Sequence, residues 1–240
     1  MGPADVRANH AIQRHEVEKV IDLRQPEATE SLDGLRIAAV HEWLSARAGS
    51  EILFEEMARA LPNAELFALT RNEDVDFDFG GRPVLTTPVQ KLGVLGERRG
   101  LTLPLMPAAW HQLSNADFDI VVSSTHAFGR EFARGHEGVH CNYVHAPMRY
   151  AWTPELDGRA SRFGPVSPAA RALLKRIDRR SVAGVTSFAA NSRAVAKRIE
   201  EFYDRDATVI HPPVNVEEFK TVERDPQGYL LAVSRWIPYK

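Results

Sequence analysis

The amino-acid sequence predicts an α/β protein with a doubly wound parallel sheet of the Rossmann-like type. Short apolar segments of strand length alternate with amphipathic segments of helix length, a pattern typical of a parallel sheet with helices on both faces. The 240 residues are 44% hydrophobic and 26% charged, as in an ordinary globular protein. A formal net charge of −2 provides no field that would hold a polyanion, so nucleic acid is not expected as a partner.

Four regions of different composition define the expected domain organisation. Residues 1–34 are polar and rich in charges, which predicts a flexible N-terminal arm. Residues 35–213 carry the alternating pattern and predict one Rossmann-like domain. A polar linker is expected at 214–228, and the new apolar segment within 229–240 predicts that the sequence stops just inside a second domain.

The first elements of the folded region follow from short patterns. A strand is expected at 35–41, because this run is compact, apolar and of buried-strand length. A helix should follow at 51–61, where apolar residues recur at spacings of three and four. Two more strands are expected at 64–70 and 83–87, the second of them short.

The middle of the chain contains a proline-interrupted segment and two strands. Pro104 and Pro107 interrupt residues 92–113, which predicts a broken helical hairpin instead of one straight helix. Residues 118–124 form the clearest buried strand of the sequence, and another is expected at 140–145.

The last elements complete the alternation. An amphipathic helix is expected at 167–182, a strand at 186–190, a helix at 192–203 and a strand at 207–210. The segment His211-Pro212-Pro213 then ends the strand, because proline cannot donate to a ladder.

One face of the helix expected at 167–182 is basic, with Arg171, Lys175, Arg176 and Arg179. Such a face meets either solvent or an anionic membrane. No apolar run approaches the roughly 18 to 20 residues that cross a bilayer, and residues 1–34 lack the apolar region of a secretory signal. The expected location is therefore the cytoplasm, with peripheral attachment at the inner face of the membrane as the alternative to a fully soluble state.

Ligands of doubly wound sheets bind at the carboxyl ends of the strands, where this sequence places polar residues. His41 ends the first strand, and Gly49 and Ser50 begin the next helix. A glycine beside a helix N-terminus lets the backbone approach an anion such as phosphate. The alternative is an ordinary helix start with Ser50 as the N-cap.

Two later strand ends carry histidines. His126 follows the strand at 118–124. A lone histidine at such a place is more often a satisfied, partly buried side chain, but its position at a strand end beside three hydroxyl residues shifts the interpretation towards a ligand contact. His145, Arg149 and Tyr150 follow the strand at 140–145. Arginine binds phosphate or carboxylate while aromatic rings stack on sugars or bases. The alternative is a structured loop in which Tyr150 and Trp152 fill the core and Arg149 pairs with an acid.

The remaining candidates lie nearer the C-terminus. Asn191 ends the strand at 186–190, where the simpler interpretation is that Asn191 and Ser192 cap the following helix. Arg235 and Lys240 follow the strand that opens the second domain, and two cations at such a place suit a diphosphate. Two solvated charges near a chain end are the alternative. The sequence lacks the H-E-x-x-H, C-x-x-C and P-loop motifs, so no metal site is expected.

Together these segments resemble glycosyltransferase family 4, the large retaining group with the GT-B fold, and are most similar to its mannosyltransferase-like bacterial members. The matching segments are residues 40–44, Gly49 with Glu51, 123–127, 145–152, 178–181, 190–193, 209–214 and 233–240. The order of the segments is that of the family. Ala48 stands where the family usually has the first of two glycines.

The resemblance implies that residues 35–213 are the acceptor-side domain of a hexosyltransferase. It implies transfer of a hexose, most simply mannose from GDP-mannose, to a glycan or lipid-linked acceptor, as in polysaccharide biosynthesis, with UDP-sugars as the alternative donors. His126 would touch the transferred sugar as the catalytic residue. The donor diphosphate would meet Gly49, Ser50, Arg235 and Lys240, and the acceptor or sugar cleft would be formed by His41, His145, Arg149, Tyr150 and Asn191.

No cofactor beyond the nucleotide sugar is expected. The family's paired glutamates lie beyond residue 240, so the isolated chain is expected not to transfer sugar by itself. A non-catalytic chain, either an acceptor-binding domain or a truncated product, is the alternative function.

Overall fold

The computed structural model describes residues 32–92, 105–113, 118–154, 167–216, 228 and 230. The chain divides into two units, Met1–Leu35 and Arg36–Lys240. Of the first unit only 32–35 are described, and they form a turn in which the Leu35 amide donates to the Leu32 carbonyl. The predictions of a flexible arm at 1–34, a linker at 214–228 and a second domain from 229 therefore fall largely outside the described residues.

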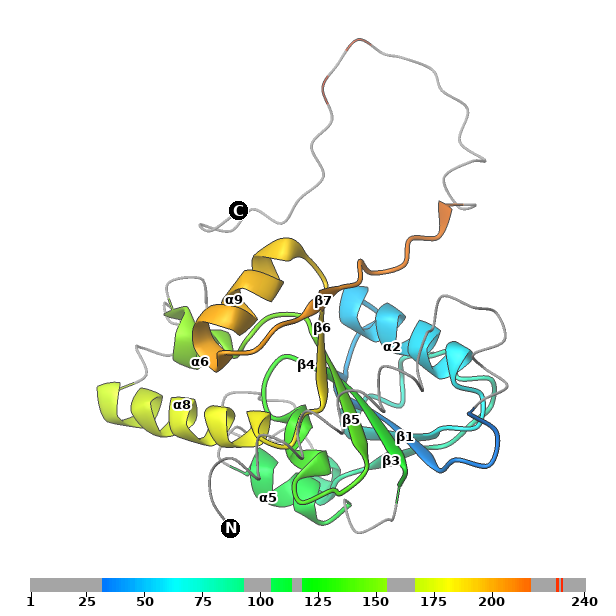
Figure 1. Ribbon diagram of the computed structural model, residues 1–240. Coiled ribbons are helices and arrows are strands. Elements are labelled where there is room, and N and C mark those ends of the chain that lie inside the picture. The colour runs from blue at the N-terminus through cyan, green and yellow to red at the C-terminus, as the bar shows by residue number, and fades with distance from the viewer. Residues whose placement is uncertain are drawn as a thin grey trace. The chain divides into compact units, whose positions relative to one another are not determined.

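The second unit is built on a parallel sheet of seven strands (Figure 1). The strands are β1 (Ile37–Leu44), β2 (Glu65–Arg71), β3 (Val84–Thr86), β4 (Ile120–Thr125), β5 (Val139–Val144), β6 (Ser187–Ala190) and β7 (Thr208–Val209). All the pairings are parallel. The predicted α/β class and doubly wound parallel sheet are confirmed.

The order of the strands is β3-β2-β1-β4-β5-β6-β7. The chain therefore builds outward from β1 in one direction, through β2 to β3, and then returns to build from β4 to β7 in the other direction. The boundary between β1 and β4 is the topological switch point, outside whose carboxyl ends doubly wound sheets bind their ligands.

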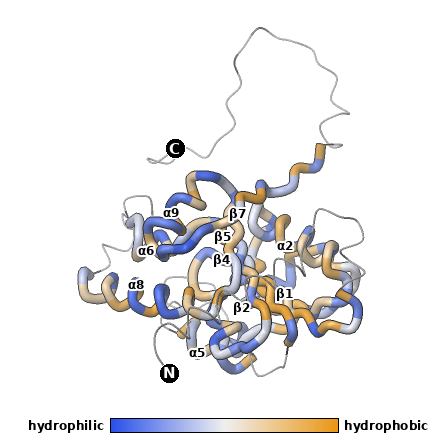
Figure 2. The backbone as a smooth tube through the Cα atoms, in the orientation of Figure 1, coloured by the Kyte–Doolittle hydropathy of each residue, from blue (hydrophilic) through white to orange (hydrophobic). Residues whose placement is uncertain are grey.

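The prediction that His41 ends the first strand is wrong. Strand β1 continues to Leu44, because β2 pairs with it as far as Trp43↔Thr70 and Leu44↔Arg71. All eight residues of β1 are buried, as expected for a central strand covered on both faces. Figure 2 shows the tube at β1 as mainly hydrophobic.

Five α-helices and two 3₁₀ helices belong to the described part of the chain. They are α2 (Gly49–Ala60), η2 (Pro88–Leu92), α5 (Met106–His111), η3 (Gly129–Ala133), α6 (Arg149–Trp152), α8 (Pro168–Val182) and α9 (Arg193–Tyr203). Helix α2 lies on the opposite side of the sheet from α5, α8 and α9 (Figure 1). The helices predicted at 51–61, 167–182 and 192–203 are confirmed with small changes of bounds.

The hydrophobic core on the α5–α8–α9 side includes Trp110, Phe132, Phe188 and Ile199. Its members come from α5, η3, β6 and α9, so burial of one apolar surface joins these elements to the sheet. Of the hairpin predicted at 92–113, the structure describes α5, in whose first turn Pro107 stands where its missing N–H costs nothing. Residues 93–104 lie outside the described residues. No helix in the described ranges is both long enough and apolar enough to cross a membrane.

Candidate functional site

The switch point brings together polar residues that are distant in the sequence. In the register of the sheet His41 of β1 lies beside Ser124 of β4, which in turn lies beside Tyr143 of β5. His126 follows β4, and His145 follows β5, where its amide donates to the Thr125 carbonyl over 3.0 Å. The structure therefore unites the predicted site residues His41, His126 and His145 in one cluster.

Ser124 links two of these histidines. Its Oγ lies 3.0 Å from His41 Nδ1 and 2.8 Å from His145 Nε2. A hydroxyl has one proton to donate, so one of the two imidazoles accepts that proton while the other donates its own. Ser124 thereby couples the tautomers of His41 and His145.

The three imidazoles differ in their access to solvent. His41 is 1% exposed and stacks on Phe54 of α2, at 5.2 Å between ring centroids. The ring of His126 stacks on that of His145 at 4.5 Å and 12°, and the His126 side chain is 36% exposed. His126 therefore has exposed surface that a substrate can reach, whereas His41 has almost none.

His145 is a neutral base at physiological pH. Burial, together with the nearby His126 and His41, lowers the pKa of His145 to about 2. The stack of His126 on His145 therefore does not place two positive charges face to face.

A buried carboxylate lies beneath His126. Glu42 of β1 is 0% exposed, and its oxygens accept from the backbone amides of His126, Ala127 and Gly129. Burial raises the pKa of Glu42, but His126 and the amides of Gly129 and Ala127 outweigh that effect and lower it below its usual value. Glu42 is therefore an ionised carboxylate inside the domain.

Gly49 and Ser50 begin helix α2, but the N-cap is Ala48, so the alternative prediction that Ser50 is the N-cap is wrong. Ala48 is extended, and its carbonyl accepts from the Ile52 amide. Ser50 Oγ donates instead to Glu51 Oε2 over 2.7 Å. A Cβ built on Gly49 would meet no atom within 4 Å, which leaves open space beside this helix N-terminus.

Arg149 and Tyr150 are the first two residues of the short helix α6, and both are partly buried. Tyr150 packs against the hydrophobic core, and Trp152 is buried within it at 9% exposure. Residues Arg149–Trp152 are thus helical, whereas the alternative prediction was a loop. The prediction that Trp152 fills the core is confirmed. The contacts described for Tyr150 and Trp152 place these two side chains in or against the core.

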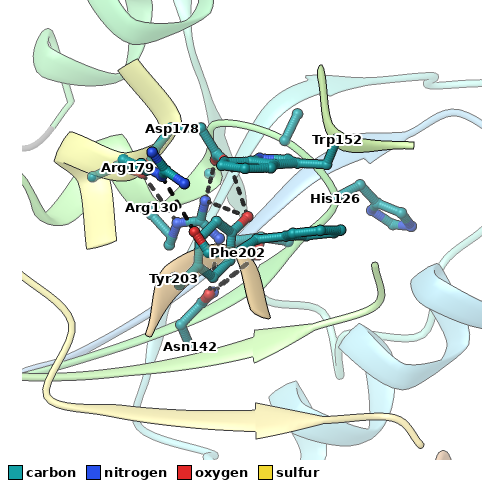
Figure 3. A network of polar contacts seen from close by, with 12 residues as sticks. His126, Arg130, Asn142, Trp152, Asp178, Arg179, Phe202 and Tyr203 are labelled. Carbon is teal, nitrogen blue, oxygen red and sulfur yellow. Dashed lines mark hydrogen bonds and ion pairs between the residues drawn. The ribbon is translucent and has the colours of Figure 1, made fainter. Parts of the chain in front are cut away.

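Trp152 belongs to a second buried polar network (Figure 3). Asp178 of α8 accepts from Trp152 Nε1 over 2.6 Å and from Tyr203 OH over 2.8 Å, and it forms an ion pair with Arg130. Burial raises the pKa of Tyr203, so its hydroxyl remains a donor. The network ties α6, α8 and α9 to η3, and Figure 3 shows His126 apart from it with its ring directed away.

Asn191 follows β6 and contacts the backbone of the cluster. Its Nδ2 donates to the His145 carbonyl over 2.9 Å, and its own carbonyl lies 3.1 Å from His211 Nδ1. The N-cap of α9 is Ser192, whose Oγ accepts from the Val195 amide, so the predicted capping role is confirmed for Ser192.

Three central residues were absent from the predicted site. Glu42 and Ser124 lie inside the segments that carry the resemblance, and a carboxylate between the apolar run at 35–41 and Trp43 was the available signal for Glu42. Arg130 had no such signal, because its partners Asp178 and Tyr203 are 48 and 73 residues away in the sequence.

Arg235 and Lys240, predicted at the donor diphosphate, lie outside the described residues. Within the ranges that the structure describes, no group of three or more His, Cys, Asp or Glu side chains is arranged to hold a metal ion.

A seven-stranded parallel sheet with a polar cluster at its switch point defines a ligand-binding domain of the doubly wound α/β class. A family model described as Glycosyltransferase Family 4 matches residues 47–218, and the chain belongs to this family. The family that the sequence motifs indicated is thereby confirmed.

Two solved structures are similar to the chain. The apo form of the lipopolysaccharide outer core galactosyltransferase WaaB shares 16% identity over 75% of this chain and 46% of that one, with a TM-score of 0.44. Anabaena Alr3699/HepE in complex with UDP and glucose shares 15% identity over 76% of this chain and 46% of that one, with a TM-score of 0.46. The chain thus spans about half the length of these two structures. No curated protein sequence matches it significantly.

Proposed function

We propose that this chain supplies the acceptor-side domain of a retaining glycosyltransferase that moves a hexose from a nucleotide sugar to a glycan or lipid-linked acceptor. The observation that carries the proposal is the histidine cluster at the β1–β4 switch point of a family 4 chain. Within it, His126 combines an exposed edge with a ring fixed by stacking on His145.

The proposed role of His126 is a hydrogen bond to the transferred sugar. A preorganised ring needs little rearrangement when charge develops on the sugar, so its contact is stronger in the transition state than in the ground state. His145 is neutral, is linked to His41 through Ser124 and stacks against the ring of His126.

The donor is proposed to be GDP-mannose, on the resemblance of residues 145–152 to mannosyltransferase-like members, with UDP-sugars as the alternative. The donor diphosphate is assigned to the open helix start at Gly49 and Ser50, together with Arg235 and Lys240. The acceptor or sugar cleft is assigned to His41, His145, Arg149, Tyr150 and Asn191, with no cofactor beyond the nucleotide sugar.

We further propose that the protein acts in the cytoplasm, with α8 as a contact to an anionic membrane. Arg171, Arg176 and Arg179 are exposed on this helix, and Leu173 is 58% exposed among them. Lys175 is only half-exposed, because its Nζ lies over the ring of Trp152 at 4.7 Å. Each basic residue near an anionic surface contributes about 1 kcal/mol of attraction.

The test of the proposed function is His126→Ala in the protein expressed at its full natural length, assayed with GDP- and UDP-sugars. We expect kcat/KM to fall by roughly a hundredfold or more, with the melting temperature unchanged. His111→Ala is the matched control, because its side chain is 39% exposed but lies on α5, where it contacts Glu131. Wild-type turnover in His126→Ala would remove the assignment of His126. An absence of transfer from every donor would favour the non-catalytic alternative.

A further inference from the structure

Glu42 carries a negative charge in the interior of the domain, where water cannot stabilise it. It lies in the middle of β1, whose eight residues are all buried, and its side chain is fully shielded from water. A buried carboxylate without partners would cost several kcal/mol, so its contacts must compensate for the loss of hydration.

The partners of Glu42 all come from the turn after β4. Oε1 accepts from the amides of Ala127 and Gly129 at 2.7 and 2.8 Å. Oε2 accepts from the amide of His126 at 2.8 Å and lies 3.5 Å from His126 Nδ1. One carboxylate thus fixes the backbone of the proposed catalytic residue through charge-assisted bonds and lies beside its ring.

The turn is packed closely around this carboxylate. A Cβ on Gly129 would lie 3.0 Å from Thr125 Cγ2, 3.2 Å from Glu42 Cγ and 3.3 Å from Glu42 Oε1. A larger residue at position 129 would therefore displace the carboxylate or the turn.

The position of Oε2 decides which nitrogen of His126 carries the proton when the ring is neutral. Nδ1 is buried, has no hydrogen-bond partner in the structure and lies 3.5 Å from the anionic Oε2, where a lone pair would be repelled and an N–H attracted. The proton then belongs on Nδ1, and the lone pair on Nε2. Among the described residues Nε2 has no hydrogen-bond partner.

We propose that Glu42 is a positioning residue that sets the tautomer of His126, so that Nε2 presents a lone pair to a hydroxyl of the substrate. The inference rests on the proposed function only for the nature of that substrate. It specifies that His126 accepts a hydrogen bond from a sugar hydroxyl and does not donate one.

The test reads the tautomer directly and requires no activity. Long-range ¹H–¹⁵N correlation spectra of the ¹⁵N-histidine-labelled 240-residue chain, at about pH 9 where an ordinary imidazole is neutral, distinguish Nδ1–H from Nε2–H. The His126 signals are assigned with His126→Ala. We expect Nδ1–H in the wild type. An Nε2–H form, or a ring that still carries both protons, would overturn the proposal.

Glu42→Gln is the informative variant, because the amide oxygen in the place of Oε1 can keep the Ala127 and Gly129 bonds. The NH₂ group in the place of Oε2 then faces Nδ1 and loses the bond from the His126 amide. A donor at that place requires the lone pair on Nδ1, so the tautomer should invert to Nε2–H. Retention of Nδ1–H in Glu42→Gln would overturn the proposal.

The chain offers a matched control in Glu131, a second buried glutamate beside a histidine, with Oε2 3.2 Å from His111 Nε2. Glu131→Gln should leave the His126 signals unchanged, and an equal tautomer change there would refute a specific role of Glu42. If Glu42→Gln does not fold, the wild-type spectrum is decisive by itself. Failure of sugar transfer with the expected tautomer would count against the proposed function alone.

Discussion

Asp178→Asn should destabilise the domain strongly although the residue lies outside the histidine cluster. Asp178 is 0% exposed and its ion-pair partner Arg130 is 2% exposed. The variant keeps the shape of the side chain but removes its charge, and the new amide nitrogen presents hydrogens to Arg130 or to the donors of Trp152 and Tyr203.

The size of the expected loss in stability follows from the buried Arg130 cation, which Asp178→Asn leaves without its ion-pair partner. The other hydrogen bonds of Arg130 go to neutral groups, Ser181 Oγ at 3.1 Å, Tyr203 OH at 3.3 Å and Asn142 Oδ1 at 3.4 Å. Breaking a buried pair by removing one partner costs about 3–5 kcal/mol. For a domain of about 150–250 residues this lowers the melting temperature by roughly 6–20 °C.

Urea unfolding followed by circular dichroism measures this loss, and a double variant tests its cause. Arg130→Met combined with Asp178→Asn removes the stranded cation, so it should be more stable than the sum of the two single changes predicts. Glu65→Ala is the control, because its pair with Arg36 is about half-exposed and should contribute little. A loss below about 1 kcal/mol in Asp178→Asn, or additive single changes, would refute the reasoning.

Three further predictions concern acid stability, packing and the membrane. Burial lowers the pKa of His140 to about 3, so below about pH 6.5 the unfolded chain binds more protons at this residue than the folded chain does. The contribution of His140 to the free energy of unfolding is complete above that pH and should fall on acidification by up to about 1.4 kcal/mol per pH unit. His140→Asn should reduce this slope in pH-dependent urea unfolding. Gly129→Ala should lower the free energy of unfolding by about 1–3 kcal/mol, because the new methyl group overpacks the turn. Gly49→Ala, whose methyl group would meet no atom within 4 Å, should change the unfolding curve little, and equal effects of the two changes would contradict the packing argument. Sedimentation with anionic vesicles should lose bound protein when Arg171 and Arg176 are both changed to glutamate, and binding that ignores lipid charge would remove the membrane proposal.

The sequence determined the elements of the sheet because each depends on a local pattern. The seven strands and the helices α2, α8 and α9 lie where apolar periodicity placed them. The short helix α6 and the 3₁₀ helix η3 were not predicted as helices, since four or five residues contain too little periodicity to be distinguished from a loop.

The sequence also indicated the histidines, because polar residues at the ends of apolar strands are expected at a ligand site. His41, His126 and His145 were identified in this way, although His41 lies inside β1 and not at its end. The extension of β1 depends on pairing with β2, a partner more than twenty residues away, which a local pattern does not contain.

Only the tertiary structure decided what surrounds these histidines. The strand order places β1 beside β4, and this pairing brings Glu42 to the amide of His126 across 84 residues of sequence. Hydrogen bonds to a buried charge form wherever the fold brings donor and acceptor together, so they follow spatial and not sequential distance. The sequence by itself therefore determined the strands and the family and indicated His126 as a candidate, while the fold determined its exposure and the carboxylate beside it.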